Sequence, residues 1–345
     1  MAANHDPDPP DRGAEPAGTV VDALAAGIES GDRAAIGQAI TLVESRRRED
    51  EPVAHDLLQR LLPLTGTAHR VGLSGVPGVG KSTFIEALGA HLTAAGHRVA
   101  VLAVDPSSPK SGGSILGDKT RMPRLAADPQ AFIRPSPSGG ALGGVARRTR
   151  ESMLVCEAAG FDVILVETVG TGQSEVAVAG MVDTFVLLLL AGAGDELQGI
   201  KKGVLELADV FVVTKADGDN RERAARAAAD LTGALRILRG TGATWQPPVL
   251  TVSARDGTGV AEVWQSLADH RHTITASGEL TKKRRDQQLA TLWGLVEERA
   301  IERLRADPRL QRLRANLELE VERGNLSPGA AAERLLEAAT PLGPD

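Results

Sequence analysis

The stretch GVPGVGKST, residues 75–83, constrains the fold of this chain more than any other. It matches the phosphate-binding pattern GxxxxGK[ST] in full. The apolar residues 69–74 before it predict a strand, and residues 83–96 after it predict a helix. Its glycines let the backbone turn N–H groups toward an anion, and the start of the helix adds a positive field. The chain is therefore predicted to be an α/β P-loop NTPase, with a mainly parallel central sheet flanked by helices.

Each position of this phosphate loop has an expected task. Backbone N–H groups along the loop would contact phosphate oxygens, while the ammonium group of Lys81 would reach the β and γ phosphates. The hydroxyl of Ser82 is the expected Mg²⁺ ligand. The alternative is a Gly-rich turn that matches by chance, and the number of agreeing features argues against it. The predicted nucleotide-binding residues here are Gly75, Val76, Pro77, Gly78, Val79, Gly80, Lys81, Ser82 and Thr83.

Three carboxylates are candidates for a metal site beside Ser82. Asp105 and Glu167 each end an apolar predicted strand, so both should lie at the carboxyl edge of the sheet, where ligands bind. Asp118 follows in the long loop after Asp105, and a helix cap is its alternative role. The frame ExxG, residues 167–170, begins at Glu167 and would bring the N–H of Gly170 to the γ phosphate. We expect Mg²⁺ ligands at Ser82, Asp105, Asp118 and Glu167, and catalytic roles for Lys81, Asp105 and Glu167.

A second motif, TKAD at 214–217, indicates which base is bound. It resembles the NKxD motif of GTPases, in which the Asp carboxylate accepts hydrogen bonds from guanine N1–H and its amine. Adenine has neither donor on that edge. Thr214 replaces the usual Asn, so a hydroxyl stands where an amide would brace the phosphate loop. We expect guanine nucleotides, GTP and GDP, to be bound with help from Thr214, Lys215, Asp217, Ser253, Ala254 and Arg255.

Composition excludes several classes of partner. A net charge of −6, five Phe, three Trp and no Tyr argue against nucleic-acid binding. The longest apolar run, 185–191, is too short to span a membrane. The single Cys156 is predicted to be a buried apolar residue, and without a secretory signal we expect a cytoplasmic protein. His270 and His272 are expected at the surface.

Four segments are predicted along the chain. Residues 1–18 should be a disordered tail, 19–66 an N-terminal helical arm, 67–276 the nucleotide domain, and 277–345 a C-terminal helical segment. The last segment carries an apolar stripe outside the sheet, which predicts a homodimer or partner contact, the alternative being that it covers its own domain. The stripe consists of Leu289, Leu292, Trp293, Val296 and Ile301.

The chain resembles the MeaB family of GTPase chaperones, also called ArgK, that accompany adenosylcobalamin-dependent methylmalonyl-CoA mutase. The resemblance runs from Ala34 to the C-terminal helices, and its motifs are GVPGVGKST, LAVDPSS, GGSILGDKTRM, FDVILVETVGTGQSE, GDELQGIKKGVLELAD and TKAD. It implies a dimeric G protein of the SIMIBI class that binds the mutase, gates cofactor delivery through GTP hydrolysis and helps to remove damaged cobalamin. It also implies that residues 192–203 form a third switch that responds to the mutase.

Other functions remain open from the sequence. A P-loop kinase or ATPase for a small metabolite would share the phosphate loop but has no reason to carry TKAD. A nickel-inserting GTPase should show clustered Cys and His, and a nucleotide-locked interaction module would not turn over. We expect hydrolysis that is slow without a partner, because Thr171 stands where a water-positioning Gln is wanted and Gln173 lies further on.

Overall fold

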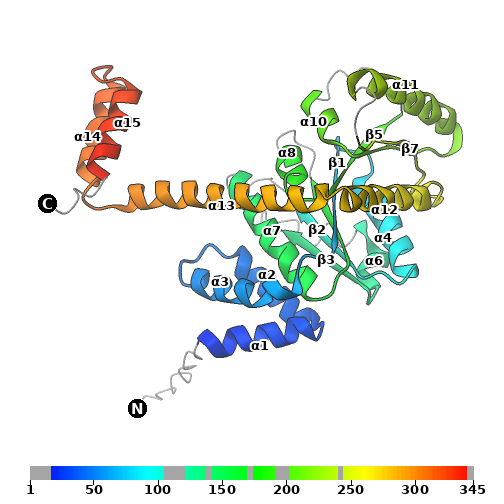
Figure 1. Cartoon of the computed structure of the whole chain (residues 1–345), viewed down its shortest axis with the longest axis horizontal. Coiled ribbons are helices and arrows are strands. Elements are labelled where there is room, and N and C mark those ends of the chain that lie inside the picture. The colour runs from blue at the N-terminus through cyan, green and yellow to red at the C-terminus, as the bar shows by residue number, and fades with distance from the viewer. Residues whose placement is uncertain are drawn as a thin grey trace, which may run out of the picture. The chain divides into compact units, whose positions relative to one another are not determined.

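The computed structural model describes residues 17–104, 121–136, 142–168, 174–191, 202–239 and 244–339. The chain divides into two compact units, Met1–Arg284 and Arg285–Asp345. The first unit contains the central sheet, and the second contains helices (Figure 1).

The first unit is built on a seven-stranded sheet in the order β3-β2-β4-β1-β5-β6-β7. All neighbouring strands pair in parallel. This arrangement confirms the predicted P-loop α/β fold. The strands are β1 His69–Gly75, β2 Val99–Val104, β3 Ala131–Ser136, β4 Val163–Thr168, β5 Thr184–Leu190, β6 Val210–Thr214 and β7 Val249–Thr251.

Helices cover both faces of the sheet, which explains why the strands are continuous apolar runs. Successive residues of β5 belong to different cores: Phe185 and Leu187 face one, and Val186 and Leu188 face the other. The second core contains α4 Lys81–Ala94, α6 Pro123–Ala127 and α12 Val260–Ala276. The first contains α7 Leu142–Ala158, α8 Ser174–Ala179, α10 Lys202–Leu207 and α11 Arg221–Arg239.

The N-terminal helices α1 Ala17–Glu29, α2 Arg33–Glu44 and α3 Asp50–Leu61 pack over α7 as part of the first unit. Asp32 caps α2 by accepting a hydrogen bond from the N–H of Ala34 at 2.9 Å. The guanidinium of Arg134 on β3 pairs with Glu44 on α2 at 2.7 Å. The helical arm is therefore attached to the sheet by polar contacts as well as by its apolar faces.

The second unit continues α13 Glu279–Ala306 into α14 Gln311–Glu322 and α15 Pro328–Ala339, which packs on α14. Leu310 and Leu317 are its buried apolar residues among those that the structure describes. The predicted apolar stripe on α13 is exposed within this chain: the exposed fractions of Trp293 and Leu292 are 63% and 52%. The other helices of the second unit therefore leave this stripe uncovered.

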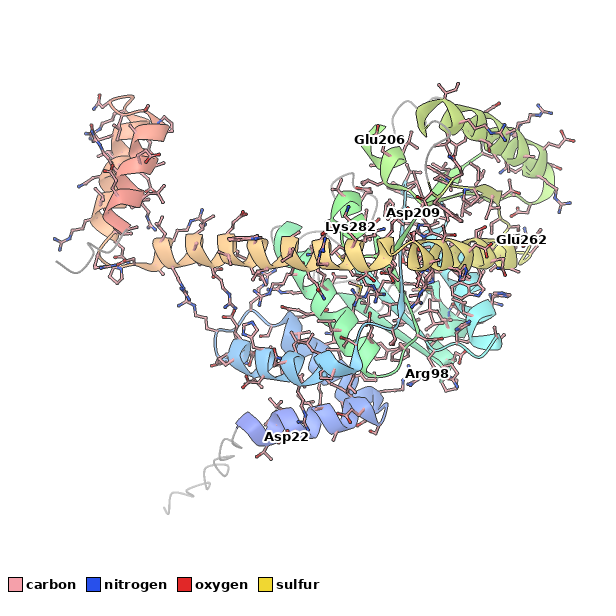
Figure 2. All side chains as sticks on the ribbon, in the orientation of Figure 1. Asp22, Arg98, Glu206, Asp209, Glu262 and Lys282 are labelled. Carbon is pink, nitrogen blue, oxygen red and sulfur yellow. The ribbon has the colours of Figure 1, made fainter. Side chains whose placement is uncertain are left out.

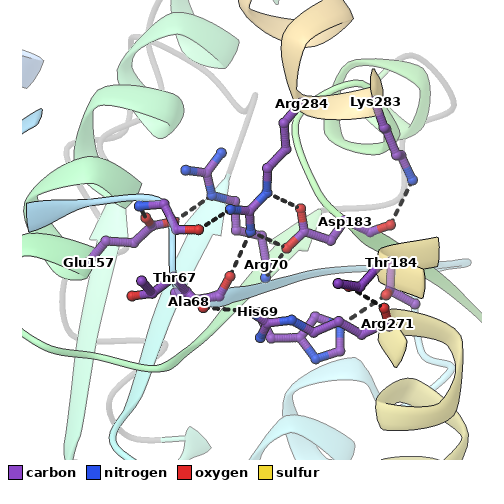
Figure 3. A network of polar contacts seen from close by, with 12 residues as sticks. Thr67, Ala68, His69, Arg70, Glu157, Asp183, Thr184, Arg271, Lys283 and Arg284 are labelled. Carbon is purple, nitrogen blue, oxygen red and sulfur yellow. Dashed lines mark hydrogen bonds and ion pairs between the residues drawn. The ribbon is translucent and has the colours of Figure 1, made fainter. Parts of the chain in front are cut away.

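The start of α13 is anchored to the base of the sheet by Arg284 (Figure 3). Its guanidinium donates two hydrogen bonds to the buried carboxylate of Asp183, at 2.8 and 2.7 Å, and also reaches the carbonyl oxygens of Gly66 and Ala68. Burial opposes ionisation of Asp183, but Arg284 outweighs it and holds the pKa of that carboxyl below its ordinary value. Residues 277–284 therefore lie with the first unit rather than with the C-terminal helices.

His270 is buried, so its predicted surface position was wrong, whereas His272 is exposed. The hydroxyl of Thr184 lies between two rings, 2.9 Å from His69 Nε2 and 2.8 Å from His270 Nδ1. This pairing gives polar partners to two imidazoles in an apolar interior, which a sequence pattern does not reveal.

Cys156 on α7 is fully buried, as predicted, and burial raises the pKa of its thiol far above the ordinary value. Charged side chains such as Asp22, Glu206 and Glu262 are exposed on the helices (Figure 2). Among the described helices, none combines the length and the apolar character needed to cross a membrane.

Candidate nucleotide site

The phosphate loop connects β1 to α4 at the carboxyl edge of the sheet. Gly78 and Gly80 have φ angles of 81° and 96°, a left-handed conformation that favours glycine. A Cβ atom at Gly75 would lie 2.5 Å from the carbonyl oxygen of Leu188 on β5. The loop geometry therefore requires glycine at all three positions of the motif.

Lys81 folds back against this loop. Its Nζ donates hydrogen bonds to the carbonyl oxygens of Gly75 at 2.8 Å and Val76 at 3.3 Å. Burial lowers the pKa of Lys81, while the nearby carboxylates of Glu167 and Glu175 act in the opposite direction. The loop thus holds an ammonium group where the motif calls for a cation.

Ser82 and Glu167 meet across the gap between α4 and β4. The Ser82 hydroxyl donates a hydrogen bond to Glu167 Oε1 at 3.0 Å. One residue further on, the Thr168 hydroxyl donates to Ser74 on β1 at 2.8 Å, which fixes the two strand ends together. A hydroxyl and a carboxylate are the hard oxygen donors that Mg²⁺ prefers, so this pair fits that ion. Within the described ranges, no group of three His, Cys, Asp or Glu residues forms a metal cluster.

Thr214, at the end of β6, reaches the phosphate loop from the side. Its hydroxyl donates a hydrogen bond to the carbonyl oxygen of Val79 at 2.7 Å and lies 3.2 Å from that of Leu189. The side chain is buried, with 4% of its surface exposed. The hydroxyl therefore braces the loop although the usual amide is absent.

The residues after β6 turn sharply beside this brace. Lys215 has a φ angle of 56°, a left-handed value rare for a residue with a side chain. Asn220 donates to its carbonyl oxygen at 2.7 Å and supports the turn. Lys215 Cε lies 4.0 Å from the position of a Cβ at Gly80, so the lysine stem passes next to the loop.

Asp217 is oriented by the loop that follows β7. The buried hydroxyl of Ser253 donates to Asp217 Oδ2 at 2.9 Å. The Ser253 N–H donates to the carbonyl of Thr258 at 3.0 Å, and the N–H of Asp256 donates to the Ser253 hydroxyl at 3.2 Å. Ala254 is half-buried and Arg255 is exposed in the same turn. The two motifs predicted to read the base are thus joined by a direct hydrogen bond.

Residues 36–309 match the family model described as methylmalonyl Co-A mutase-associated GTPase MeaB. The chain belongs to the MeaB family. As a MeaB-family protein, it is a P-loop GTPase that hydrolyses GTP to GDP and phosphate.

Full-length relatives agree with this MeaB assignment. A probable GTPase of Mycobacterium tuberculosis is 57% identical over 339 residues, which cover 98% of both chains. The mouse protein named methylmalonic aciduria type A homolog, mitochondrial, is 50% identical over 328 residues, 92% of this chain and 79% of its own. A crystal structure titled LAO/AO transport system kinase superposes with a TM-score of 0.73 at 41% identity, covering 92% of this chain and 97% of its own.

Several residues expected in a MeaB site lie outside the described residues, namely Asp105, Asp118, Gly170, Thr171, Gln173 and the loop 192–201. One residue near the site was missed by the sequence interpretation. Glu175, in the first turn of α8, is buried and its charge acts on Lys81. The signal available was an acid at the start of the helix that follows the ExxG frame.

Proposed function

We propose that this chain is a GTP-dependent switch that assists adenosylcobalamin-dependent methylmalonyl-CoA mutase in cofactor loading, protection and reactivation. The observation that carries the proposal is the match over 36–309 to a family described by its association with that mutase. The name of the mouse relative, which refers to methylmalonic aciduria, supports the same partner. The bound nucleotide would control when the chain acts on the mutase, because GTP and GDP order the loops at the sheet edge differently.

In this proposal the loop 75–83 holds the phosphates and TKAD reads guanine. Lys81 supplies positive charge to the β and γ phosphates, and the N–H of Gly170 meets the γ phosphate. Asp217 accepts from the guanine ring while Ser253 keeps its carboxylate oriented, at 2.9 Å. Lys215 covers the base from the phosphate-loop side, and Thr214 keeps that loop in place. Ala254 and Arg255 contribute the turn that closes on the base.

Ser82 and Glu167 would hold Mg²⁺, together with Asp105 and Asp118. The ion, when bound, neutralises charge on the phosphates. The chain's own contribution is to place these oxygen donors: the Ser82 and Glu167 oxygens are already 3.0 Å apart. Hydrolysis is expected to be slow alone and faster with the mutase, because the residues just after Gly170 provide no Gln at the first position.

The remaining parts of the chain take supporting roles in this proposal. Residues 1–18 are a tail, 19–66 a helical arm and 67–276 the GTPase domain, while the segment 277–345 dimerises or binds the partner. The exposed stripe around Trp293 supports the homodimer. A cytoplasmic location with no nucleic-acid or membrane partner fits the acidic composition.

The test combines full-length protein with an adenosylcobalamin-dependent methylmalonyl-CoA mutase in Mg²⁺ and GTP. GTP turnover should rise at least about tenfold when the mutase is added, and inactivated mutase should regain activity only when GTP is present. The variant Lys81→Ala is the control, and it should show neither the increase in GTP turnover nor the recovery of mutase activity. The proposal would be overturned if the mutase left GTP turnover unchanged and if this protein, with GTP, left the activity of the inactivated mutase unchanged.

The kinase alternative predicts a different fate for the γ phosphate. With γ-labelled GTP or ATP and a mixture of small metabolites, a kinase would transfer label to an organic acceptor. The GTPase proposal predicts that all label appears as inorganic phosphate and that ATP is a poor substrate.

A further inference from the structure

A cavity of about 520 Å³ opens in the first unit, between helix α12 and the starts of β1 and β4. It lies far from the phosphate loop, because His69 in its wall begins β1 whereas Gly75 ends that strand. A seven-residue strand is about 20 Å long. The volume falls within the range of small-molecule sites, roughly 300–1,000 Å³. The nucleotide proposal gives this cavity no task.

One wall is a single face of α12. Trp264, Ala268, Arg271 and Thr275 line the cavity, and their spacing of four, three and four residues places them on the same side of a helix. Ala268 is small, so space remains between the indole and the guanidinium, whose Cα atoms lie about 10 Å apart along the axis. The neighbouring face, about a quarter-turn away around the helix, is buried in the core and holds the helix in place through Val263, Leu267 and Ile274.

Arg271 presents a fixed cation to this cavity. Its guanidinium donates a hydrogen bond to the carbonyl oxygen of Thr67, which anchors it beside the start of β1 (Figure 3). In the part of the chain that the structure describes, no carboxylate lies within ion-pair distance of this guanidinium. Burial lowers the pKa of Arg271, which marks a charge held partly away from water. An anionic group would therefore find unused donors there.

The other wall supplies rings and a carboxylate that is already hydrogen-bonded. Trp264 meets the His97 ring edge-on at 5.2 Å and the His69 ring at 5.9 Å, so three flat side chains converge. Asp162 Oδ2 lies 2.6 Å from His97 Nδ1, and its Oδ1 accepts from the N–H of Arg98 at 2.7 Å. Both oxygens of the cavity's acid are thus occupied, and repulsion of an anion is reduced.

We propose that this cavity binds a small aromatic anion, with its ring against Trp264 and its carboxylate, sulfonate or phosphate at Arg271. A cation at the same place would be repelled by the guanidinium. A neutral ring would give the N–H groups of Arg271 no anionic acceptor, and hydrogen bonds to an anion are the stronger ones. The distance along α12 between the indole and the guanidinium suits a ligand with one ring system and one acidic group.

The probe for the test is dansylglycine, an aromatic carboxylate whose fluorescence is excited by energy transfer from tryptophan. Its neutral analogue is dansylamide. Titrated into the full-length protein with GDP present, dansylglycine should bind one per chain, and dansylamide should bind about tenfold more weakly or worse. Trp264→Phe should reduce the energy transfer although Trp245 and Trp293 remain.

Three variants locate the site. Arg271→Gln should weaken dansylglycine about tenfold and remove its advantage over dansylamide. Ala268→Leu should weaken both probes by filling the cavity, whereas Ala261→Leu, at an exposed position of the same helix, should change neither. GDP affinity, measured in each variant, confirms that the domain is folded. The proposal is overturned if wild-type binding does not saturate, if excess GDP displaces the probe, or if Arg271→Gln binds dansylglycine as the wild type does.

Discussion

The hydroxyl of Thr214 donates a hydrogen bond to the carbonyl oxygen of Val79, 135 positions earlier in the chain, at 2.7 Å. This contact joins the end of β6 to the phosphate loop. It shows that a hydroxyl on a buried strand end reaches the same loop that an amide would support. The departure from the usual Asn therefore leaves a bracing contact in place.

Replacing Thr214 by Val should remove this brace without changing the side chain's shape. A buried carbonyl left without its donor costs about 1–3 kcal/mol, so GDP should dissociate about tenfold faster. Thr214→Ser keeps the hydroxyl and is the matched control. Stopped-flow release of a fluorescent GDP analogue measures both variants, and equal rates in the two would contradict the bracing role.

Asp217→Asn should change the preferred base. Hydrogen bonds to a charged group contribute about 1.5–3 kcal/mol each, so losing two should weaken GTP by two orders of magnitude or more. The new amide is a donor that opposes the guanine amine but matches the carbonyl of xanthine. The exposed Asp219→Asn is the control and should bind GTP normally. Competition among GTP, ATP and xanthosine triphosphate decides the matter, and the idea fails if the Asp217 variant shows no shift toward xanthine.

Glu167→Gln should reduce GTP hydrolysis far more than GDP affinity. Loss of one positioned electrostatic group costs about a hundredfold in rate, and the variant should also need more Mg²⁺ for half-maximal activity. The variants Asp105→Ala and Asp118→Ala should likewise lose GTP hydrolysis more than GDP affinity. Glu262→Gln, at an exposed site on α12, should leave both properties unchanged. Normal hydrolysis by the Glu167 variant at low Mg²⁺ would remove that residue from the metal site.

The sequence was sufficient for features that depend on neighbours along the chain. The phosphate loop and TKAD are local patterns, and their steric requirements are visible in glycine positions such as Gly78 and Gly80. The motifs also placed two pairs of distant residues together, Ser82 with Glu167 and Ser253 with Asp217. Other contacts between distant segments could not be predicted, because no periodicity links Arg284 to Asp183. His270 was misplaced for the same reason: its partner, Thr184, lies on another element, and a polar residue with no partner nearby in the sequence is expected at the surface.

The stability of the fold should fall with acid because of His69. Burial lowers its pKa to about 3, with Asp183 opposing and Arg271, His270 and Arg284 adding to the effect. Between pH 6.5 and 3 the unfolded chain binds a proton that the folded chain excludes, so the free energy of unfolding decreases as pH falls.

The expected loss from His69 is about 2 kcal/mol between pH 6.5 and 5. His69→Gln should flatten this dependence, while His272→Gln, at an exposed position, should keep it. Urea denaturation at several pH values measures the effect. His270 contributes in the same direction in both variants, so the comparison isolates His69. Parallel curves for wild type and His69→Gln would show that His69 is not the group responsible.

The C-terminal stripe and the Arg284 anchor can be separated by truncation. A chain ending at residue 288 keeps Arg284 but lacks the stripe, so it should be a stable monomer that binds GDP. A chain ending at 277 also loses Arg284 and leaves the Asp183 carboxylate buried without it, which costs about 3–5 kcal/mol.

Sedimentation and urea denaturation of these two truncated chains provide the measurements. In the full-length protein, Trp293→Glu should shift a dimer toward monomer, and Ala290→Glu on the same helix is the control. A full-length protein that sediments as a monomer at high concentration would exclude the dimer.

Cys156 gives the molecule a practical property. It is the single cysteine of the chain, fully buried on α7, with a thiol that burial keeps protonated. A cysteine introduced at any exposed position would therefore be the only thiol available to maleimide or methanethiosulfonate reagents. Dyes or spin labels can be placed on α13 or beside the phosphate loop in an otherwise native sequence.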